Sequence, residues 1–271
     1  MTTLQSVPRP TRGVVNPAAG EKVFRLQRYL PEADLAPFVE HFWLVAWSLP
    51  DDVTHVQRTL PRPAVHVVFE AGHTAIFGVM TGAFEYKQRG SGRVLGVSFR
   101  SGAFRAFLKA ELQSITDREL PLSAVFDCDD VQAERSVLDA PDDAGMVAAA
   151  SALLRRSLPT PDPAVERIAD ILQTISGNAD ITQVRQLADQ VGLSVRKLQM
   201  LFKDYVGASP KWVIRRNRLL DAADLLAKDS DIDLAGLAQR LGYYDQSHFT
   251  TDFEKLIGKP PADYRRSCKA G

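Results

Sequence analysis

The chain has 271 residues, of which 33 are Lys or Arg and 33 are Asp or Glu, so its formal net charge is zero. This length suits two domains of about 100–160 residues each, and the balanced charge excludes a polycation that binds nucleic acid through bulk charge. The sequence contains neither an apolar run of about 18 residues nor a signal-peptide core. We therefore expect a cytoplasmic protein with no membrane segment.

Residues 1–20 are rich in proline and glycine and predict a flexible N-terminal arm. Short apolar or alternating runs then follow, separated by turn signals, as is typical of antiparallel strands. We expect strands at 23–30, 41–49, 64–70, 74–80 and 93–100, with a short helix at 34–41 between them. The pattern indicates a compact antiparallel β-domain of the barrel type.

Helices at 101–110, 130–138 and 142–158 are expected to flank the strands, so that residues 21–158 form one β-rich regulatory domain. The segment Pro159-Thr-Pro-Asp-Pro163 is the clearest linker in the chain. Asp162 and Pro163 also provide a cap and a first turn for a helix at 164–176. Residues 164–271 then form an all-helical domain, and the fold class of the whole chain is α+β.

The segment 183–266 contains the same unit twice, with an offset of 50 residues that becomes 51 after the turn. In each copy, apolar residues recur at helical spacing, a glycine such as Gly192 ends the helix, and Ser194 or Asp245 can cap the next one. This pattern predicts a helix-turn-helix, which presents its second helix to the major groove of DNA. One copy alone would fit a helical hairpin of an ordinary bundle equally well, but two copies in near-fixed register favour DNA binding.

The outward faces of the two candidate recognition helices carry side chains suited to DNA. Arg and Gln make bidentate contacts to base edges, and Ser and Thr pair with bases or phosphates. The candidate DNA-binding residues are Arg196, Lys197, Gln199, Met200 and Lys203 in the first helix, and Gln246, Ser247, Thr250 and Thr251 in the second. A solvated helix surface is the alternative interpretation for each residue. Because the second helix has no base-reading arginine, we expect it to discriminate less between sequences or to act mainly through the DNA backbone.

The segment 210–228 between the copies predicts a helix of about 18 residues, roughly 27 Å long. Such a rod can hold the two recognition helices about one turn of B-DNA apart, ~34 Å, in adjacent major grooves. Arg215 would then be a further DNA-binding residue near the phosphates. For Arg218 we favour a structural ion pair with Asp221 or Asp224.

These residues together resemble the DNA-binding domain of the AraC/XylS family of transcription regulators. The resemblance covers about 165–266 and rests on six motifs: Leu-Ala-x3-Gly-Leu-Ser (187–194), Leu-Gln-x2-Phe-Lys (198–203), Gly-x-Ser-Pro (207–210), Arg-Leu-x2-Ala-x2-Leu-Leu (218–226), Leu-Gly-Tyr-x3-Ser-x-Phe (241–249) and Phe-x3-Ile-Gly-x-Pro-Pro-x2-Tyr-Arg (253–265). It implies a seven-helix domain with two helix-turn-helix motifs, RNA polymerase as a partner, and a cupin-like N-terminal module for effector binding or dimerisation. Members often have a basic residue where Met200 and Thr251 stand, and Asp252 and Glu254 replace a commonly basic flank, which weakens the expected grip of the second motif.

Aromatic residues of the β-domain are the candidates for an effector pocket, because pockets are mostly apolar with a few placed polar groups. The candidate effector-binding residues are Trp43, Trp47, Arg58, His66, Phe69 and Arg100. Aromatics at alternating strand positions are more often plain core, which is the alternative. We expect double-stranded DNA, a small-molecule effector and a second copy of the chain as partners.

Two alternatives concern the N-terminal domain alone. It is either only a dimerisation or protein-interaction module, or a cupin-type enzyme fused to a DNA-binding domain. His55, His66 and His73 with Glu70 invite a metal interpretation, but they do not form a His-x-His pair followed by Glu. The sequence also lacks a nucleophile elbow and a phosphate-binding glycine loop. We therefore expect no catalytic residues, no metal and no cofactor.

Overall fold

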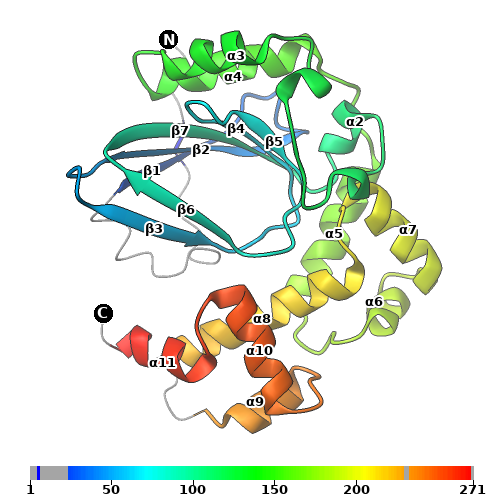
Figure 1. Cartoon of the computed structure of the whole chain (residues 1–271). Coiled ribbons are helices and arrows are strands. Elements are labelled where there is room, and N and C mark those ends of the chain that lie inside the picture. Colours follow the sequence, from blue (N-terminus) through cyan, green and yellow to red (C-terminus); the bar gives the residue numbers. More distant parts are fainter. Residues whose placement is uncertain (1–4, 7–23, 229–231, 270–271) are drawn as a thin grey trace.

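The computed structural model describes residues 5–6, 24–228 and 232–269. Figure 1 shows a β-rich N-terminal part, with α3 and α4 lying across one side of it, and a helical C-terminal part on the opposite side. Most of the segment 1–20, for which an arm is expected, lies outside the described residues. Within the described ranges, no helix combines the length and the apolarity that a bilayer crossing requires.

The N-terminal part contains two antiparallel sheets. A six-stranded sheet has the order β1-β2-β7-β4-β5-β8, and a separate two-stranded sheet pairs β3 with β6. The strands are β1 (Phe24–Tyr29), β2 (Val39–Ser48), β3 (Thr54–Thr59), β4 (His66–Phe69), β5 (Ala75–Phe77), β6 (Phe84–Arg89), β7 (Ser91–Phe99) and β8 (Glu119–Leu120). The predicted antiparallel β-rich domain is confirmed.

The prediction of a short helix at 34–41 is wrong. Residues 33–38 form turns, and the strand β2 already begins at Val39. Pro37 has no N–H to donate to a helical ladder, and β-branched and aromatic residues follow it, which favours the extended chain. Val39 pairs with Phe99 of β7, and a register shift separates it from His41.

The sequence prediction also missed β3 and β6. In β3 the half-buried side chains on the side of the six-stranded sheet are polar, namely His55 and Gln57, while the apolar Val56 points outward and is 48% exposed. The usual apolar alternation is therefore inverted. In β6 the alternation of Phe84 and Tyr86 with charged residues was a usable signal.

The other helices agree closely with the expected ranges, but the helix expected at 101–110 covers only Phe104–Leu108. Two one-turn 3₁₀ segments, Leu112–Ile115 and Leu122–Ala124, lie between α2 and α3. The helices are α2 (Phe104–Leu108), α3 (Asp130–Leu138), α4 (Asp143–Arg156), α5 (Ala164–Gly177), α6 (Val184–Gln190), α7 (Val195–Tyr205), α8 (Pro210–Lys228), α9 (Leu234–Arg240), α10 (Gln246–Ile257) and α11 (Pro261–Lys269).

The predicted helix caps are present. Ser194 accepts a hydrogen bond from the backbone N–H of Lys197 at the start of α7, and Asp245 accepts one from His248 at the start of α10. Gly192 has φ +67°, a left-handed conformation that glycine adopts without steric cost, and it turns the chain from α6 into α7. The predicted structural role of Arg218 is confirmed, because this residue is 1% exposed and pairs with Asp221 at 3.3 Å.

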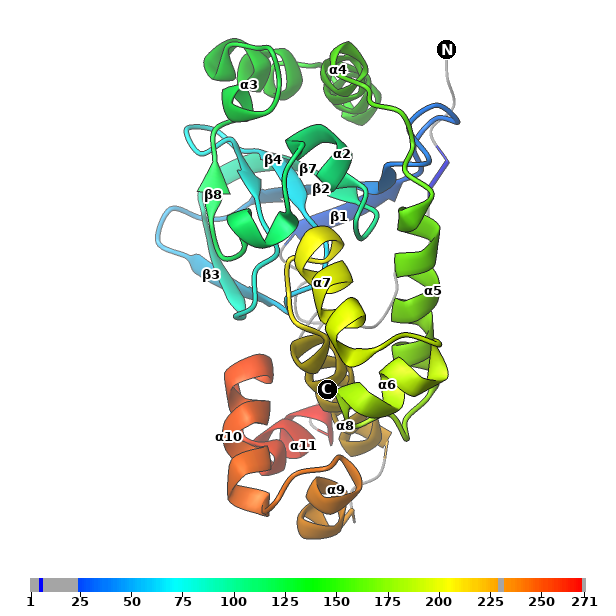
Figure 2. The same cartoon turned by 90° about the vertical axis from the view of Figure 1, so that its right-hand side faces the viewer.

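The apolar core divides the helical part into two units. The larger cluster runs without interruption from the six-stranded sheet, through Phe99 and Phe107, into α5, α6 and α7, where Leu198 and Phe202 are fully buried. A second cluster is formed mainly by α8–α11, around Phe249 and Phe253. Accordingly, Figure 2 shows α7 directly beside the β-rich part and α9 farther from it.

Candidate nucleic-acid interface

The first recognition helix, α7, has one buried and one exposed face. Leu198 and Phe202 are 0% exposed, which fixes the rotation of the helix. The five candidate residues of this helix are all exposed: Arg196, Lys197, Gln199, Met200 and Lys203. Met200, at 57% exposure, is an apolar side chain in water, and such a side chain can contact a thymine methyl group.

The second recognition helix, α10, is anchored by Phe249 and Phe253, which are both 0% exposed. Its candidate residues Gln246, Ser247 and Thr251 are exposed, and Thr250 is half-buried. The hydroxyl of Thr251 donates to the backbone oxygen of Ser247 at 3.0 Å, so its own helix already uses that donor. The exposed candidate face of α10 is thus uncharged.

Arg215 of α8 pairs with Asp252 of α10 at 3.2 Å and remains 46% exposed on its side chain. The Asp252 side chain is only 9% exposed and also lies 3.6 Å from the imidazole of His248. Burial and the neighbouring Asp252 carboxylate raise the pKa of the Tyr243 hydroxyl. Asp252, which the sequence analysis expected to weaken DNA binding, therefore points into the protein, where it joins α10 to α8.

Lys203, a candidate phosphate contact, is held by the N-terminal part. Its ammonium group lies 2.7 Å from a carboxylate oxygen of Glu111, and this pair raises the pKa of Lys203. Close by, the hydroxyl of Thr116 donates to the backbone oxygen of Gly207 at 2.5 Å. Arg105 lies over the ring of Tyr205 at 4.7 Å from its centroid. The C-terminal end of α7 thus contacts the N-terminal part at three points.

Sequence reasoning missed Tyr244. This side chain is 97% exposed in the turn that leads into α10, immediately before the cap Asp245. This large aromatic ring is left in water beside a recognition helix, where it is free to contact a partner. The signal was available in the sequence, because Tyr244 stands in the turn of a helix-turn-helix, where Leu241 and Tyr243 already pack against the core.

Three of the six candidate effector residues lie on the inner face of the six-stranded sheet, opposite the β3–β6 sheet. Trp43 and Trp47 lie against Gly96 and Gly92 of β7, where any Cβ would overlap their rings. The indole N–H of Trp43 donates to Nδ1 of His66 at 3.4 Å. Burial lowers the pKa of His66 to about 3, so this imidazole is neutral at pH 7.

The other three candidates do not face this interior. Phe69 is 1% exposed and belongs to the core on the opposite face of the sheet, because its neighbour Val68 occupies the inner face. Arg58 points outward to α10, and Arg100 pairs with Glu166 of α5 at 2.9 Å. The sequence grouping is corrected here: alternation along β3 and β4 turns Arg58 and Phe69 away from the inner face.

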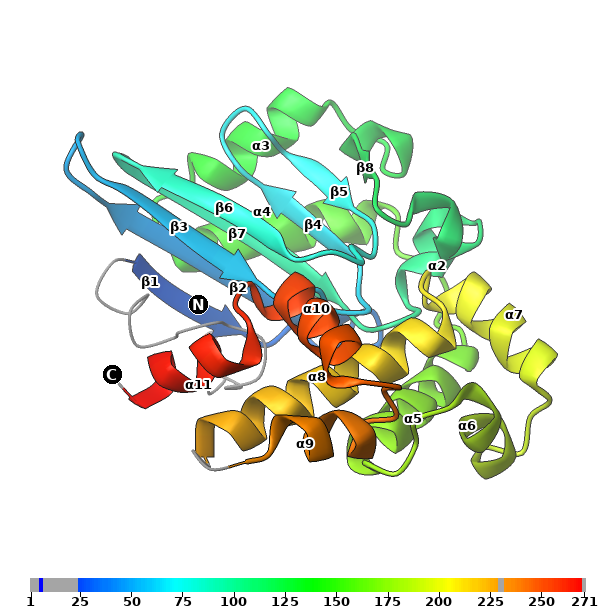
Figure 3. The ribbon, with the colours of Figure 1, turned by 60° about the horizontal axis from the view of Figure 1, so that its bottom comes forward.

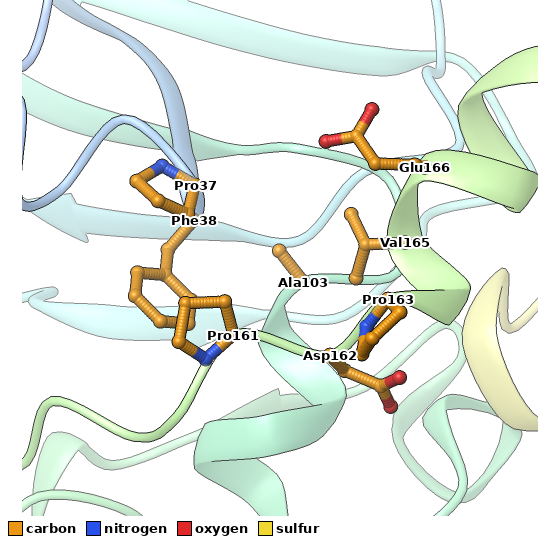
Figure 4. A pocket seen from close by; sticks show the side chains of 8 residues that line it. All are labelled: Pro37, Phe38, Ala103, Pro161, Asp162, Pro163, Val165 and Glu166. Atoms are coloured by element: carbon orange, nitrogen blue, oxygen red, sulfur yellow. The ribbon is translucent and has the colours of Figure 1, made fainter.

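A small cavity of about 150 Å³ lies where the linker crosses the N-terminal part (Figure 4). Its lining is mainly apolar, and none of the candidate effector residues takes part in it. The lining residues are Pro37, Phe38, Ala103, Pro161, Asp162, Pro163, Val165 and Glu166. Both carboxylates already have partners, since Asp162 accepts from Tyr205 at 2.7 Å and Glu166 pairs with Arg100.

The histidines considered for a metal site are far from a common centre. His73 bonds Glu119 at 2.9 Å, whereas His66 bonds Trp43 and His55 lies beside Phe24. In the part of the chain that the structure describes, no group of three or more His, Cys, Asp or Glu is placed to hold a metal ion.

In comparisons with known proteins, the N-terminal and C-terminal parts of the chain match two different families. Residues 187–267 match a family described as "Helix-turn-helix domain", and residues 27–121 match a domain of unknown function (DUF6597). The HTH-type transcriptional activator RhaS of Pectobacterium atrosepticum is 35% identical over 82 residues, which are 30% of this chain and 29% of RhaS. RhaS of Escherichia coli is 34% identical over 88 residues, 32% of this chain and 31% of that protein.

Among solved structures, the C-terminal domain of AraT, a response regulator from Geobacillus stearothermophilus, is 28% identical. It covers 39% of this chain and 86% of that domain, with a TM-score of 0.33. The match to the curated relatives spans less than a third of their length. The helix-turn-helix match at 187–267 contains both units, so the C-terminal part of this chain is an AraC-type helix-turn-helix domain.

Proposed function

We propose that this chain is a sequence-specific DNA-binding regulator of transcription, controlled by its β-rich N-terminal domain. The observation that carries the proposal is the pair of recognition helices, α7 and α10, each capped, each anchored by fully buried aromatic or leucine side chains, and each exposing polar side chains. The 19 residues of α8 between the two units give a rod of about 28 Å, close to the spacing of adjacent major grooves.

The two helices have different proposed roles. In α7, Arg196 and Gln199 read base edges, while Lys197 approaches a phosphate. In α10, Gln246 and Ser247 contact bases or phosphates, and Tyr244 adds an apolar surface at the same end of the helix. The description of the relatives as transcriptional activators supports activation as the outcome and RNA polymerase as a protein partner.

Selection of bound sequences from random DNA by the full chain tests this proposal. We expect a motif with two parts about one helical turn apart. The double variant Arg196→Ala, Gln199→Ala should lose the first part and keep the second, and Arg118→Ala, an exposed arginine of the N-terminal part, is the matched control. Recovery of no motif by the wild-type chain, or the same motif from the double variant, would contradict the proposal.

We also propose that the inner face of the β-domain receives a small-molecule effector. Trp43, Trp47 and His66 converge there, and Tyr86 of β6 packs against Trp47 with ring centroids 5.8 Å apart. A ligand bound there would raise the melting temperature of the wild-type chain by mass action. The increase should be lost in Trp43→Ala and kept in Phe38→Leu, a conservative change at the linker cavity. If the increase is lost in the second variant and not in the first, the effector binds at the linker instead.

The second copy expected as a partner is tested with the same DNA. A chain that acts as a homodimer should select the composite motif as a repeat with fixed spacing. A single unrepeated motif, together with a monomeric mass in light scattering, would count against a homodimer.

A further inference from the structure

The end of β3 and the residues after it, 58–61, cross from the N-terminal part to the second helix-turn-helix unit. Figure 3 shows the tip of β3 next to α10 and above α8. We refer to residues 58–61 as the β3 strap. The sequence placed Arg58 in an effector pocket, and neither the proposed DNA contacts nor the proposed effector site uses any other residue of the strap.

Leu60 of the strap is buried in the core of the second unit. It is 5% exposed and belongs to the apolar cluster that contains Leu219, Leu220 and Phe253. Among the described residues, every other fully buried member of that cluster comes from α8, α9 or α10. The N-terminal domain therefore contributes one apolar side chain to a core that is otherwise formed by the second unit.

Arg58 binds the C-terminal end of α10. Its guanidinium donates to the backbone oxygen of Lys255 at 3.2 Å and pairs with Glu85, its cross-strand neighbour on β6, at 3.2 Å. The last carbonyl groups of a helix lack partners and carry partial negative charge, so a cation is favourable there. The guanidinium lies so close to Gly258, the left-handed residue that ends α10, that any Cβ at this position would overlap it.

The strap also contacts α8. The guanidinium of Arg216 donates to the backbone oxygen of Pro61, and the indole N–H of Trp212 donates to the backbone oxygen of Thr81 at 3.1 Å. Both acceptors belong to loops of the N-terminal part. The N-terminal part therefore contacts the first half of α8, which packs in the larger cluster, and also the end of α10, so the second unit is held at α10 as well as through α8.

We infer that the β3 strap is the element that positions the second recognition helix relative to the first. The first unit shares its core with the N-terminal domain and needs no separate anchor. The second unit has its own core and is joined to the first unit through α8. Its contacts with the strap therefore help to determine its placement. Arg58 and Leu60 are thus positioning residues for DNA recognition, and this inference rests on the proposed function.

The first test needs no DNA. Amide hydrogen exchange is compared among the full-length wild type, Leu60→Ala and Arg58→Gln. Val56→Ala, on the same strand with an exposed side chain, and Lys87→Gln, a charge removed from the same sheet, are the matched controls. In both strap variants, amides of α9 and α10 should exchange about tenfold faster or more, while those of α6 and α7 stay unchanged. Leu60→Met and Arg58→Lys should restore most of the protection.

The second test uses the composite site selected by the wild type, with its two parts moved apart by five base pairs, which is half a helical turn. Wild type should bind the altered site about tenfold more weakly or worse. The strap variants should bind the original site more weakly and discriminate less between the two spacings, with contacts to the first part retained.

The outcomes separate the two proposals. Unchanged exchange in α9 and α10, or equally faster exchange in α6 and α7, overturns the inference whatever the DNA result. Strap variants that keep the full spacing preference of the wild type also overturn it. A wild-type chain that selects no DNA motif refutes the proposed function, while the exchange measurements still decide whether the strap holds the second unit.

Discussion

The two helix-turn-helix units have the same local design and different attachments. The first unit continues the core of the N-terminal domain, and Thr116 and Glu111 contact the end of its recognition helix. The second unit has its own core and touches the N-terminal domain through a few side chains, chiefly Arg58 and Leu60. The exposed face of α7 carries cations, whereas the exposed candidate face of α10 is uncharged.

This difference indicates that the two copies of the repeat have different roles in DNA binding. The first unit is built as part of a rigid body, so its position follows from the fold of the N-terminal domain. The second unit is a smaller body on a helical rod, and its charged residues Arg215 and Asp252 are used to join helices. We therefore expect the first unit to supply most of the electrostatic affinity and the second to add shape and spacing.

The largest expected effect is on the thermal stability of the two apolar clusters, which should unfold separately. Phe202→Ala and Phe253→Ala each remove a fully buried aromatic ring, at a cost of about 3–5 kcal/mol. In Phe253→Ala, calorimetry should show an early transition of the second unit while the remainder melts as in the wild type. In Phe202→Ala, the main transition itself should move to lower temperature. A single transition that shifts equally in both variants would mean that the two clusters unfold together.

A smaller effect compares the recognition helices. Arg196→Ala should weaken binding to the selected site by about 1–3 kcal/mol and relax base choice at its position. Gln246→Ala should cost less, because α10 has no charged side chain among its candidates. Fluorescence anisotropy on selected and random DNA measures both. An equal loss for Arg196→Ala on the two DNAs would show that this side chain contacts the backbone and not a base.

Lowering the pH should destabilise the N-terminal domain and the first unit that shares its core. Burial lowers the pKa of His41 to about 4 and that of His66 to about 3, against about 6.5 in the unfolded chain. These depressed values favour folding fully above pH 6.5, and that contribution is lost as the pH falls from 6.5 to about 4 for His41 and to about 3 for His66. Between pH 7 and 5 the loss is about 1–2 kcal/mol for each histidine.

Thermal melts at pH 7 and pH 5 check this expectation. The transition of the N-terminal domain and first unit should fall, and His66→Gln should reduce the slope. A fall confined to the second unit would contradict the assignment, since neither histidine packs there.

The smallest expected effect concerns Glu111. Glu111→Gln frees Lys203 from its exposed ion pair and removes a negative charge beside α7, so DNA affinity should rise about twofold at low salt. The gain should vanish at high salt because exposed charges are screened. Glu254→Gln, an exposed carboxylate on α10, is the counterpart in the second unit. A gain that persists at high salt would rule out simple competition for Lys203.

The sequence was sufficient for features that depend on local rules. Caps at Ser194 and Asp245, the turn at Gly192 and the apolar faces of α7 and α10 all follow from short-range patterns, and the structure confirms them. The ion pair of Arg218 with Asp221 also lies within one helix. Strands with an apolar face were found for the same reason.

Features that depend on tertiary contacts were beyond the sequence. Nothing in Thr54–Thr59 shows that His55 and Gln57 face inward, or that Arg58 contacts α10, 197 residues away. Likewise, Asp252 resembled a repulsive charge near DNA until its partner Arg215 was located on α8. Whether Phe69 or Val68 faces the interior depends on the register of β4 with β7, which a one-residue shift would reverse.

The placement of the three tryptophans gives the protein intrinsic optical reporters. Trp43 and Trp47 lie over Gly96 and Gly92 inside the β-domain, and Trp212 bonds Thr81 across the boundary between the N-terminal part and α8. Ultraviolet emission from a Trp43→Phe, Trp47→Phe chain would come from the boundary alone, and emission from Trp212→Phe from the β-domain alone. Ligand entry and separation of the two parts can therefore be followed independently in solution without an attached dye.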